Sequence, residues 1–263
     1  MKIILLYTTI LITFALGCTK KENSEFLSNI KTKKVLRVGT TGDYKPFTYK
    51  SISGDTYSGI DIDLMNLLSG QLGVKLEIVD TTWPSLMNDF KAKKFDIALS
   101  GITQTSQREL IADFSNPYHM GGKVPFGRCK DLERFKDIKN LDQKNVKFIV
   151  NPGGTNEKFT RKLIKKAKII LHTDNKTVFD EILEGNADIM ISDSIEVDIL
   201  TQIHKGKICR FKDQPFKESM HNIAIMIPKE IGVKEFINEW ISNLKNSGKL
   251  KEIFDKHLTI PQQ

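Results

Sequence analysis

The chain has 263 residues, of which 40% are hydrophobic and 27% charged, and its 40 Lys and Arg against 32 Asp and Glu give a formal charge of +8. This length suits one large core or two lobes. Because the lysines are mixed with Glu and Asp, the charge argues against a nucleic-acid-binding protein and weakly favours anionic small ligands. The five histidines have no metal-ligand spacing, so we expect no metal site.

The first 17 residues have the features of a secretory signal peptide. Lys2 precedes a short apolar stretch that ends at Gly17, which is too short to span a bilayer stably. The segment Ala15-Leu16-Gly17-Cys18 resembles a lipoprotein cleavage site, although the leucine stands one place nearer the cysteine than usual. The polar segment 18–32 would suit a tether. We expect export to the periplasm, and the sequence leaves open whether Cys18 carries a lipid anchor.

Strand and helix patterns then alternate in two runs. The first run predicts strands at 35–39, 75–79 and 95–99 and helices at 61–72 and 84–91. The second predicts strands at 146–150, 168–171 and 189–191 and helices at 155–166, 175–183 and 194–203. A last strand at 222–227 precedes a helical C-terminus. Two such runs predict an α/β protein of two lobes, each with a parallel sheet.

The chain is expected to cross between the lobes twice. Residues 123–129 are interpreted as an extended linker, and residues 213–219 as the second crossing. We predict lobe 1 at 33–124 and 218–263, lobe 2 at 125–217, and a ligand cleft between them.

Cys129 and Cys209 each stand beside one of these crossings. In an exported protein an isolated cysteine pair favours a disulfide. The bond would join the two ends of lobe 2.

The most informative segment is Asn-Pro-Gly-Gly-Thr-Asn-Glu-Lys-Phe at 151–159, directly after a mostly apolar run. It predicts a strand, a loop and a helix in succession. Gly153 and Gly154 would let N–H groups face outward, and Thr155 could cap the helix. Such a helix N-terminus can bind a carboxylate or phosphate. A glycine pair alone would equally fit an ordinary turn, but the rest of the chain favours an anion site.

Several motifs together resemble a known family over nearly the whole mature chain. They are Val-Gly-Thr-Thr-Gly-Asp-Tyr-Lys-Pro-Phe (38–47), Gly-Ile-Asp-Ile-Asp-Leu (59–64), Phe-Asp-Ile-Ala-Leu-Ser-Gly-Ile-Thr (95–103), Arg108, Phe-Ser-Asn-Pro-Tyr (114–118) and Ala-Asp-Ile-Met-Ile-Ser-Asp (187–193). This order resembles the type II periplasmic solute-binding fold of amino-acid ABC transporters. Within that superfamily, segment 41–47, Trp83, segment 151–159 and Ser-Asp-Ser-Ile-Glu (192–196) resemble the cyclohexadienyl dehydratases.

The resemblance implies a periplasmic enzyme that converts prephenate to phenylpyruvate and arogenate to phenylalanine. Prephenate is a dianion that loses CO2 and a hydroxyl group to become aromatic. The reaction therefore needs cationic groups and one protonated acid, and it needs no cofactor.

The resemblance assigns the general acid to Glu196. It lies three residues after Asp193 on a predicted helix, so the two carboxylates can share a face. A neighbouring negative charge and burial in a cleft would both raise its pKa. The alternative is an ordinary glutamate on a solvated helix face.

The remaining site residues are assigned by the same resemblance. Arg108 is expected to clamp one substrate carboxylate bidentately, and Lys123 could hold the second. Because a tight grip on the leaving carboxylate would oppose decarboxylation, a neutral donor such as Asn151 would serve better there. Asp193 would pair with an amine, as in amino-acid binders, which suits arogenate but leaves the preference between arogenate and prephenate open. The other expected substrate contacts are the ring walls Tyr44 and Trp83 together with Ser100, Gly101, Gly154 and Thr155.

One stretch is shared by enzymes and binders alike. Residues 104–109 have the ordinary Thr-x-x-Arg form of a binding protein. The alternative function is therefore an amino-acid-binding protein that delivers its ligand to an ABC permease, with Glu196 as a ligand contact.

Overall fold

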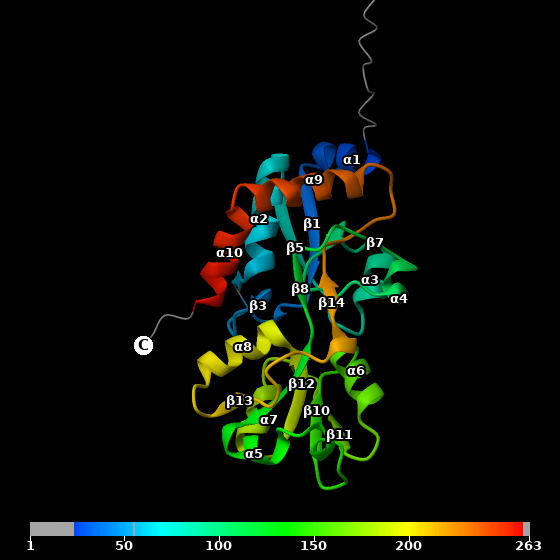
Figure 1. Ribbon diagram of the computed structural model, residues 1–263. Coiled ribbons are helices and arrows are strands. Elements are labelled where there is room, and N and C mark those ends of the chain that lie inside the picture. Colours follow the sequence, from blue (N-terminus) through cyan, green and yellow to red (C-terminus); the bar gives the residue numbers. More distant parts are fainter. Residues whose placement is uncertain (1–23, 55, 260–263) are drawn as a thin grey trace, which may run out of the picture.

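The computed structural model describes residues 24–54 and 56–259. The predicted signal peptide and Cys18 lie outside the described residues, so they stay predictions. No helix in the described part is both long and apolar enough to span a membrane. The described chain folds into two α/β lobes, one above the other in Figure 1.

Lobe 1 contains a five-stranded mixed sheet with the order β5-β1-β6-β15-β7. Strands β5, β1 and β6 are parallel, and β15 runs antiparallel to both of its neighbours. Helices cover the sheet, with α1 and α9 at its upper end in Figure 1. The elements are α1 (Glu25–Lys33), β1 (Val35–Thr40), α2 (Ile60–Leu72), β5 (Lys75–Asp80), α3 (Leu86–Lys91), β6 (Ile97–Ala98), α4 (Ser106–Glu109), β7 (Asp113–Phe114), β15 (Met226–Ile227), α9 (Val233–Asn246) and α10 (Lys249–Leu258). A small separate sheet contains β2 (Asp43–Tyr44), β3 (Thr48–Lys50) and β4 (Tyr57–Ser58).

Lobe 2 contains a second mixed sheet with the order β11-β10-β12-β9-β13. Strands β11, β10 and β12 are parallel, and β9 runs antiparallel to β12 and β13. The elements are β9 (Lys123–Arg128), η1 (Cys129–Asp131), α5 (Leu132–Phe135), η2 (Ile138–Asn140), β10 (Lys147–Val150), α6 (Thr155–Leu163), β11 (Lys168–Leu171), α7 (Val178–Glu184), β12 (Ile189–Asp193), α8 (Ser194–Ile203), β13 (Ile208–Arg210) and η3 (Lys217–Ser219).

Two predictions about the sheets are wrong. Both sheets are mixed rather than parallel, and the expected linker at 123–129 is strand β9 in the interior of the second sheet. Pro125 and the nearby glycines resemble a linker in the sequence, since proline rarely occurs in a central strand. Here Pro125 still accepts through its carbonyl from the N–H of Phe211. The lobe boundaries drawn from the sequence stay a prediction.

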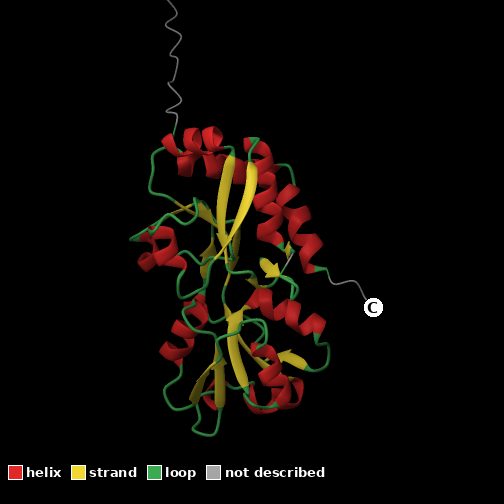
Figure 2. Ribbon diagram, turned by 180° about the vertical axis from the view of Figure 1, so that it is seen from behind, coloured by secondary structure: helices red, strands yellow, loops and turns green. Residues whose placement is uncertain are grey.

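The connections between the lobes are short paired strands. β8 (His119–Gly121) and β14 (His221–Ile223) run antiparallel to each other, and both lie between the two sheets in Figure 1. The predicted strand 222–227 is thus divided into β14 and β15. Figure 2 shows from behind that helices pack beside the sheet in each lobe.

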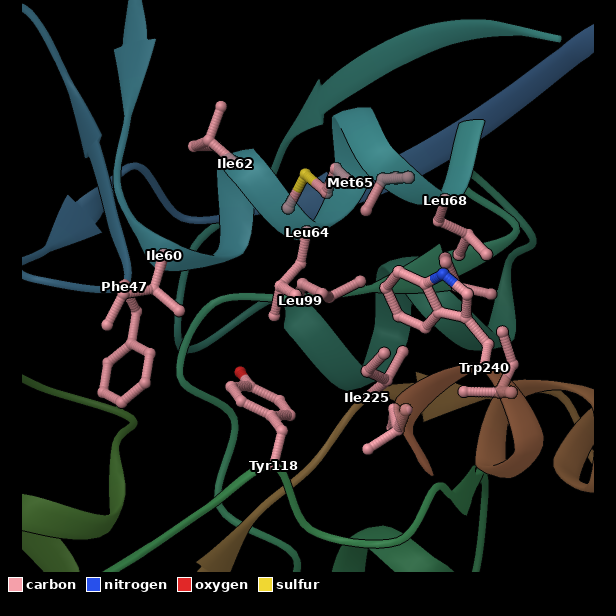
Figure 3. Close-up of a cluster of buried hydrophobic side chains, with 14 of the residues drawn as sticks. Phe47, Ile60, Ile62, Leu64, Met65, Leu68, Leu99, Tyr118, Ile225 and Trp240 are labelled. Atoms are coloured by element: carbon pink, nitrogen blue, oxygen red, sulfur yellow. The ribbon is translucent and has the colours of Figure 1, made fainter. Parts of the chain in front are cut away.

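The core of lobe 1 forms where α2 meets the sheet and the C-terminal helices. Leu64 and Leu68 are spaced one turn apart and are each 1% exposed, as an amphipathic helix requires. Trp240 of α9 packs in this cluster, and Tyr118 lies at its lower edge with the hydroxyl directed toward α2 (Figure 3). This core fixes the start of α2 and the end of β6, which face the other lobe.

The predicted disulfide is present. Cys129 and Cys209 are joined; they are 80 positions apart in the sequence, and their Cα atoms lie 4.7 Å apart. The backbone N–H of Cys129 also donates to the carbonyl of Lys207 at 2.8 Å. The bond therefore links the end of β9 to β13.

Candidate active site

A small cavity lies between the lobes, with a volume of about 20 Å³. That is room for about one water molecule. The lobes touch around it, since Lys176 Nζ donates to the carbonyl of Lys50 at 2.8 Å and Asn175 Nδ2 to that of Asp43 at 3.0 Å. The structure is therefore a closed arrangement, and the lobes must separate to admit a ligand. The cavity is lined by Tyr44, Trp83, Gly101, Thr103, Asn151, Gly154, Thr155, Asn156, Asn175 and Asp193.

Segment 151–159 forms the predicted strand end, loop and helix, with one correction. Gly154 is the N-cap of α6 and Thr155 is its first helical residue, so Thr155 is not the cap. Gly153 has a φ of 85°, and a Cβ there would approach the backbone nitrogen of Pro84 to 2.7 Å. Only glycine allows this close approach between the loop and lobe 1.

The N–H groups at the start of α6 face the cavity. The N–H of Gly153 donates to Glu157 at 2.8 Å, but none of the described residues accepts a hydrogen bond from those of Gly154, Thr155 or Asn156. Unpaired N–H groups at a helix N-terminus attract an anion. Beside them, Asn151 is buried and its Oδ1 has no partner in the described structure.

Asp193, at the end of β12, is 3% exposed and has both oxygens occupied. Its Oδ1 lies 2.7 Å from Lys123 Nζ and 3.2 Å from His221 Nε2, and its Oδ2 accepts from the Tyr44 hydroxyl. The angles at Oδ1 do not meet hydrogen-bond criteria, so these two contacts are close electrostatic ones. Burial would raise the pKa of Asp193, but the charge of Lys123 and the contact with His221 hold it well below its usual range.

Lys123 is equally enclosed. Besides Asp193, its ammonium contacts Thr155 Oγ1 at 2.9 Å and Asn156 Oδ1 at 2.5 Å. Two hydrogen-bonded side-chain oxygens and the ion-paired carboxylate of Asp193 thus surround the ammonium. In this arrangement Lys123 is enclosed by protein oxygens and is not free to take the second substrate carboxylate that the resemblance assigned to it.

A directional chain of hydrogen bonds leads from Lys123 to Glu196. Because the lysine can only donate, the atom of Asn156 beside it is the oxygen, and Nδ2 then donates to Ser192 Oγ at 2.8 Å. The Ser192 hydroxyl in turn donates to Glu196 Oε2. Oε2 thus accepts a hydrogen bond in this arrangement, which is compatible with a neutral Glu196 that carries its proton on Oε1.

Glu196 lies in the first turn of α8 and is 2% exposed. Burial raises its pKa to about 8; the Ser192 hydrogen bond opposes this rise and the charge of Asp193 adds to it. A carboxylic acid of this kind holds its proton at neutral pH. Glu196 does not line the closed cavity, but its neighbours Asp193 and Tyr44 do.

Arg108, in α4, is a buried cation without a carboxylate partner in the described structure. It is 8% exposed, its Nη1 donates to the carbonyl of Thr103 at 2.7 Å, and its guanidinium carbon is 6.0 Å from the Trp83 ring centroid. Burial lowers its pKa to about 10, so it stays charged at neutral pH. An uncompensated buried guanidinium beside a cavity is suited to an incoming carboxylate.

Aromatic rings form the lobe 1 wall of the cavity. Tyr44 and Trp83 meet edge to face, with centroids 5.8 Å apart, and Trp83 Nε1 donates to Asp43 at 3.2 Å. Gly101 has a φ of 58°, and a Cβ there would come within 2.6 Å of the Tyr44 and Phe47 rings. Glycine therefore lets the backbone lie directly against this wall.

Beneath Gly101 lies the buried carboxyl of Asp61. It accepts from the Gly101 N–H at 2.6 Å and from the Tyr118 hydroxyl at 2.7 Å. Burial raises its pKa to about 7, against the effect of these two hydrogen bonds. Asp61 anchors the cavity wall to the core of lobe 1.

The structure brings together most of the residues that the sequence singled out. Seven of them line the cavity, and Glu196, Arg108 and Lys123 are linked to that lining by the contacts above. Ser100 is not brought to the cavity, because it is fully buried and its hydroxyl accepts from the N–H of Thr41 at 3.1 Å.

Sequence reasoning did not single out the side chains of three cavity residues, Thr103, Asn156 and Asn175. Thr103 and Asn156 stand inside motifs that were quoted, and Asn175 follows β11, where a parallel strand presents binding groups at its carboxyl end. That positional signal could have identified Asn175. The described residues contain no cluster of His, Cys, Asp or Glu able to hold a metal ion.

Comparison with known proteins gives the family. Residues 36–260 match the model of the bacterial extracellular solute-binding proteins, family 3. The chain belongs to this family. It is 42% identical to a cyclohexadienyl dehydratase of Pseudomonas aeruginosa over 226 residues, which cover 86% of this chain and 83% of that protein.

Two solved structures of this family are similar to the chain. One is an ancestral amino acid-binding protein described as a precursor of cyclohexadienyl dehydratase, with 32% identity and a TM-score of 0.81 over 89% of this chain and 99% of that one. The other is an ancestral cyclohexadienyl dehydratase, with 42% identity and a TM-score of 0.55 over 89% and 96%. Both support the two-lobed type II fold with a ligand cleft between the lobes.

Proposed function

We propose that this family 3 protein is a periplasmic cyclohexadienyl dehydratase, a carbon–oxygen lyase that converts prephenate to phenylpyruvate and arogenate to phenylalanine. The observation that carries the proposal is Glu196, a buried carboxylic acid whose pKa of about 8 keeps it protonated at neutral pH. A protein that only binds amino acids has no need of a buried proton donor. The 42% identity to the Pseudomonas aeruginosa enzyme supports the same function.

The proposed reaction needs one proton and no cofactor. The bond between the ring carbon and its carboxylate breaks, CO2 leaves, and the electron pair of that bond enters the ring. The ring aromatises as the carbon–oxygen bond at the opposite position breaks, and Glu196 Oε1 gives its proton to the hydroxyl, which leaves as water. Glu196 is left as a carboxylate and regains a proton from solvent before the next turnover.

The other groups bind the dianion. Arg108 takes the side-chain carboxylate as a bidentate partner. Asn151 and the N–H groups of Gly154 to Asn156 bind the leaving carboxylate. Because these donors carry only partial charges, they stabilise the bound carboxylate too weakly to oppose decarboxylation. Tyr44 and Trp83 exclude water from the ring.

The test is incubation of purified protein with prephenate while phenylpyruvate is followed by ultraviolet absorbance. A reaction without protein at the same pH measures the uncatalysed rate, and Glu196→Gln measures protein that binds without the proton donor. Wild-type turnover no faster than the reaction without protein would reject the enzyme, whereas equal turnover of the two proteins above that rate would reject only Glu196 as the proton donor.

A second candidate function is an amino-acid-binding protein of an ABC transporter. The ancestral binder, which has the higher TM-score of the two solved structures, favours it. A binder should be stabilised against heat by lysine, arginine or glutamine through mass action. The dehydratase should instead be stabilised by phenylpyruvate, and a large shift with one proteinogenic amino acid and none with phenylpyruvate would favour the binder.

Export is also part of the proposal. The family description is of extracellular proteins, and the signal-like residues 1–17 and the Cys129–Cys209 disulfide suit the periplasm. Whether Cys18 carries a lipid is tested by mass spectrometry of the mature N-terminus.

A further inference from the structure

The two substrates of the proposed reaction differ at one group. Arogenate carries an ammonium where prephenate carries a ketone. A buried ammonium needs an anionic acceptor with unshared lone pairs, because the desolvation of an unpaired charge is costly. Among the described residues that line the cavity, the only carboxylate is that of Asp193.

Asp193 is already neutralised by the protein. Its Oδ1 lies 2.7 Å from the Lys123 ammonium and 3.2 Å from His221 Nε2, and its Oδ2 accepts from the Tyr44 hydroxyl. A substrate ammonium at this carboxylate would therefore lie close to the positive charge of Lys123. Like charges a few ångströms apart in a buried site repel strongly.

The pair between Asp193 and Lys123 is built into one lobe. The two residues are directly opposite each other in the antiparallel pair β12 and β9, where opposing side chains lie on the same face of the sheet. Separation of the lobes removes Tyr44, which belongs to lobe 1, but leaves this ion pair intact. Lys123 would thus accompany Asp193 in the open form that a substrate meets.

Lys123 is also held in place by its other contacts. Its Nζ donates to Thr155 Oγ1 at 2.9 Å and Asn156 Oδ1 at 2.5 Å, both in the first turn of α6, and its side chain is 4% exposed. To release Asp193, the lysine would have to leave three oxygens at once. Glu196, the buried carboxyl in the first turn of α8, is held neutral by burial and cannot replace it.

We propose that Lys123, by occupying Asp193, makes this site select the keto acid prephenate over the amino acid arogenate. The inference rests on the proposed function for its substrates, but the selection itself is a property of binding. A ketone needs no anion, and the side-chain carboxylate of either substrate still meets Arg108. In an amino-acid binder the same aspartate has to be available to the ligand.

Activity provides the first test. In the wild type, kcat/KM for prephenate should exceed that for arogenate by about tenfold or more. A buried substrate group that finds no matching partner, here the ammonium of arogenate, lowers kcat/KM by at least this factor. Lys123→Met keeps an unbranched side chain only one atom shorter and removes its charge, so the ratio should fall by about tenfold or reverse. Lys162→Met, an exposed lysine of α6, is the matched control and should leave the ratio unchanged.

Binding of the two products provides a second test that does not require turnover. Calorimetry should show that phenylpyruvate binds wild-type protein more tightly than L-phenylalanine, and that Lys123→Met gains affinity for L-phenylalanine. The wild-type comparison stands even if the variant fails to fold.

The outcomes separate the two proposals. A dehydratase that uses arogenate as well as prephenate, and binds both products equally, would overturn the selection and leave the function intact. A protein without turnover that still prefers phenylpyruvate would overturn the function and leave the selection intact. Tighter binding of L-phenylalanine than of phenylpyruvate by the wild type would overturn the selection whichever function is correct.

Discussion

The Ser192 hydroxyl donates a hydrogen bond to Oε2 of Glu196, and both residues are almost completely buried. Ser192 is the last link of a chain that starts at Lys123 and passes through Asn156. Asn156 donates to the Ser192 hydroxyl, and the hydroxyl donates onward to Glu196, so the hydrogen bonds run in one direction along the chain. Two side chains thus orient the proposed general acid. Asn156 lines the cavity, and Ser192 lies behind that lining.

Ser192→Ala should shift the pH profile of the reaction to higher pH. The hydrogen bond favours the charged carboxylate, so its loss raises the pKa of Glu196 further above about 8. Since a general acid works only while protonated, the rate falls as pH rises through this pKa, and the variant should keep its activity to higher pH. The measurement is kcat/KM for prephenate against pH, with the surface change Ser247→Ala as control. An alkaline limb that stays in place or moves down in pH would contradict the role of Ser192.

Glu196→Gln should abolish nearly all dehydratase activity without abolishing ligand binding. General acid catalysis typically contributes on the order of 100- to 10,000-fold, and glutamine keeps the shape of the side chain. Turnover of prephenate and calorimetric binding of phenylpyruvate are measured on the same protein. Glu184→Gln, on the exposed end of α7, is the control. Near-normal turnover in Glu196→Gln would show that another group supplies the proton.

Arg108→Ala should weaken binding of the ligand carboxylate, whichever function is correct. The guanidinium has no carboxylate partner in the described structure, and loss of a buried charge-assisted pair costs about 2–5 kcal/mol. Arg108→Lys should recover only part of the affinity, because an ammonium cannot bind bidentately. Calorimetry with phenylpyruvate checks this, with the exposed Arg134→Ala as control, and unchanged affinity would place the carboxylate elsewhere.

Wild-type protein should lose stability relative to Glu196→Gln as pH rises from about 4.5 to 8. In the folded state burial raises the pKa of Glu196 from 4.5 to about 8, so in this window the folded protein holds a proton that the unfolded chain releases. The stability contribution is therefore present below pH 4.5 and is lost as pH rises through the folded pKa, by an amount on the order of a few kcal/mol. Urea unfolding of both proteins across this range measures the difference, and parallel curves would refute the raised pKa. Asp61 contributes in the same direction in both proteins, so it cancels.

Replacement of Cys129 and Cys209 together by serine should lower the free energy of unfolding. The bond joins residues 80 positions apart, and loop-closure entropy gives such a bond about 3–5 kcal/mol. Urea midpoints of the double variant and the oxidised wild type measure the loss, and mass spectrometry of non-reduced peptides checks the pairing. Equal midpoints would show that the disulfide does not constrain the unfolded chain.

Local patterns were sufficient for most of the fold. The hydrophobic periodicity that predicts α2 and α8 and the apolar run that ends at Val150 lie within short windows of sequence, where a side chain's face is set by its spacing alone. The two-lobed α/β class followed from their alternation, and the pairing of Cys129 with Cys209 followed from their number and the expected export.

The partners of the site residues required the tertiary structure. In the sequence, Lys123 is one of many lysines and stands in a predicted linker. In the structure, β9 lies between β12 and β13 and places Lys123 opposite Asp193, 70 positions away. The sequence assigned each of these charges to a substrate, and the structure instead assigns them to each other. Strand pairing depends on backbone hydrogen bonds, which are the same for every residue, so no local pattern of side chains records which strand lies beside which. The sequence by itself determined which chemical groups the site contains, and only the folded chain decided which of them remain available to a ligand.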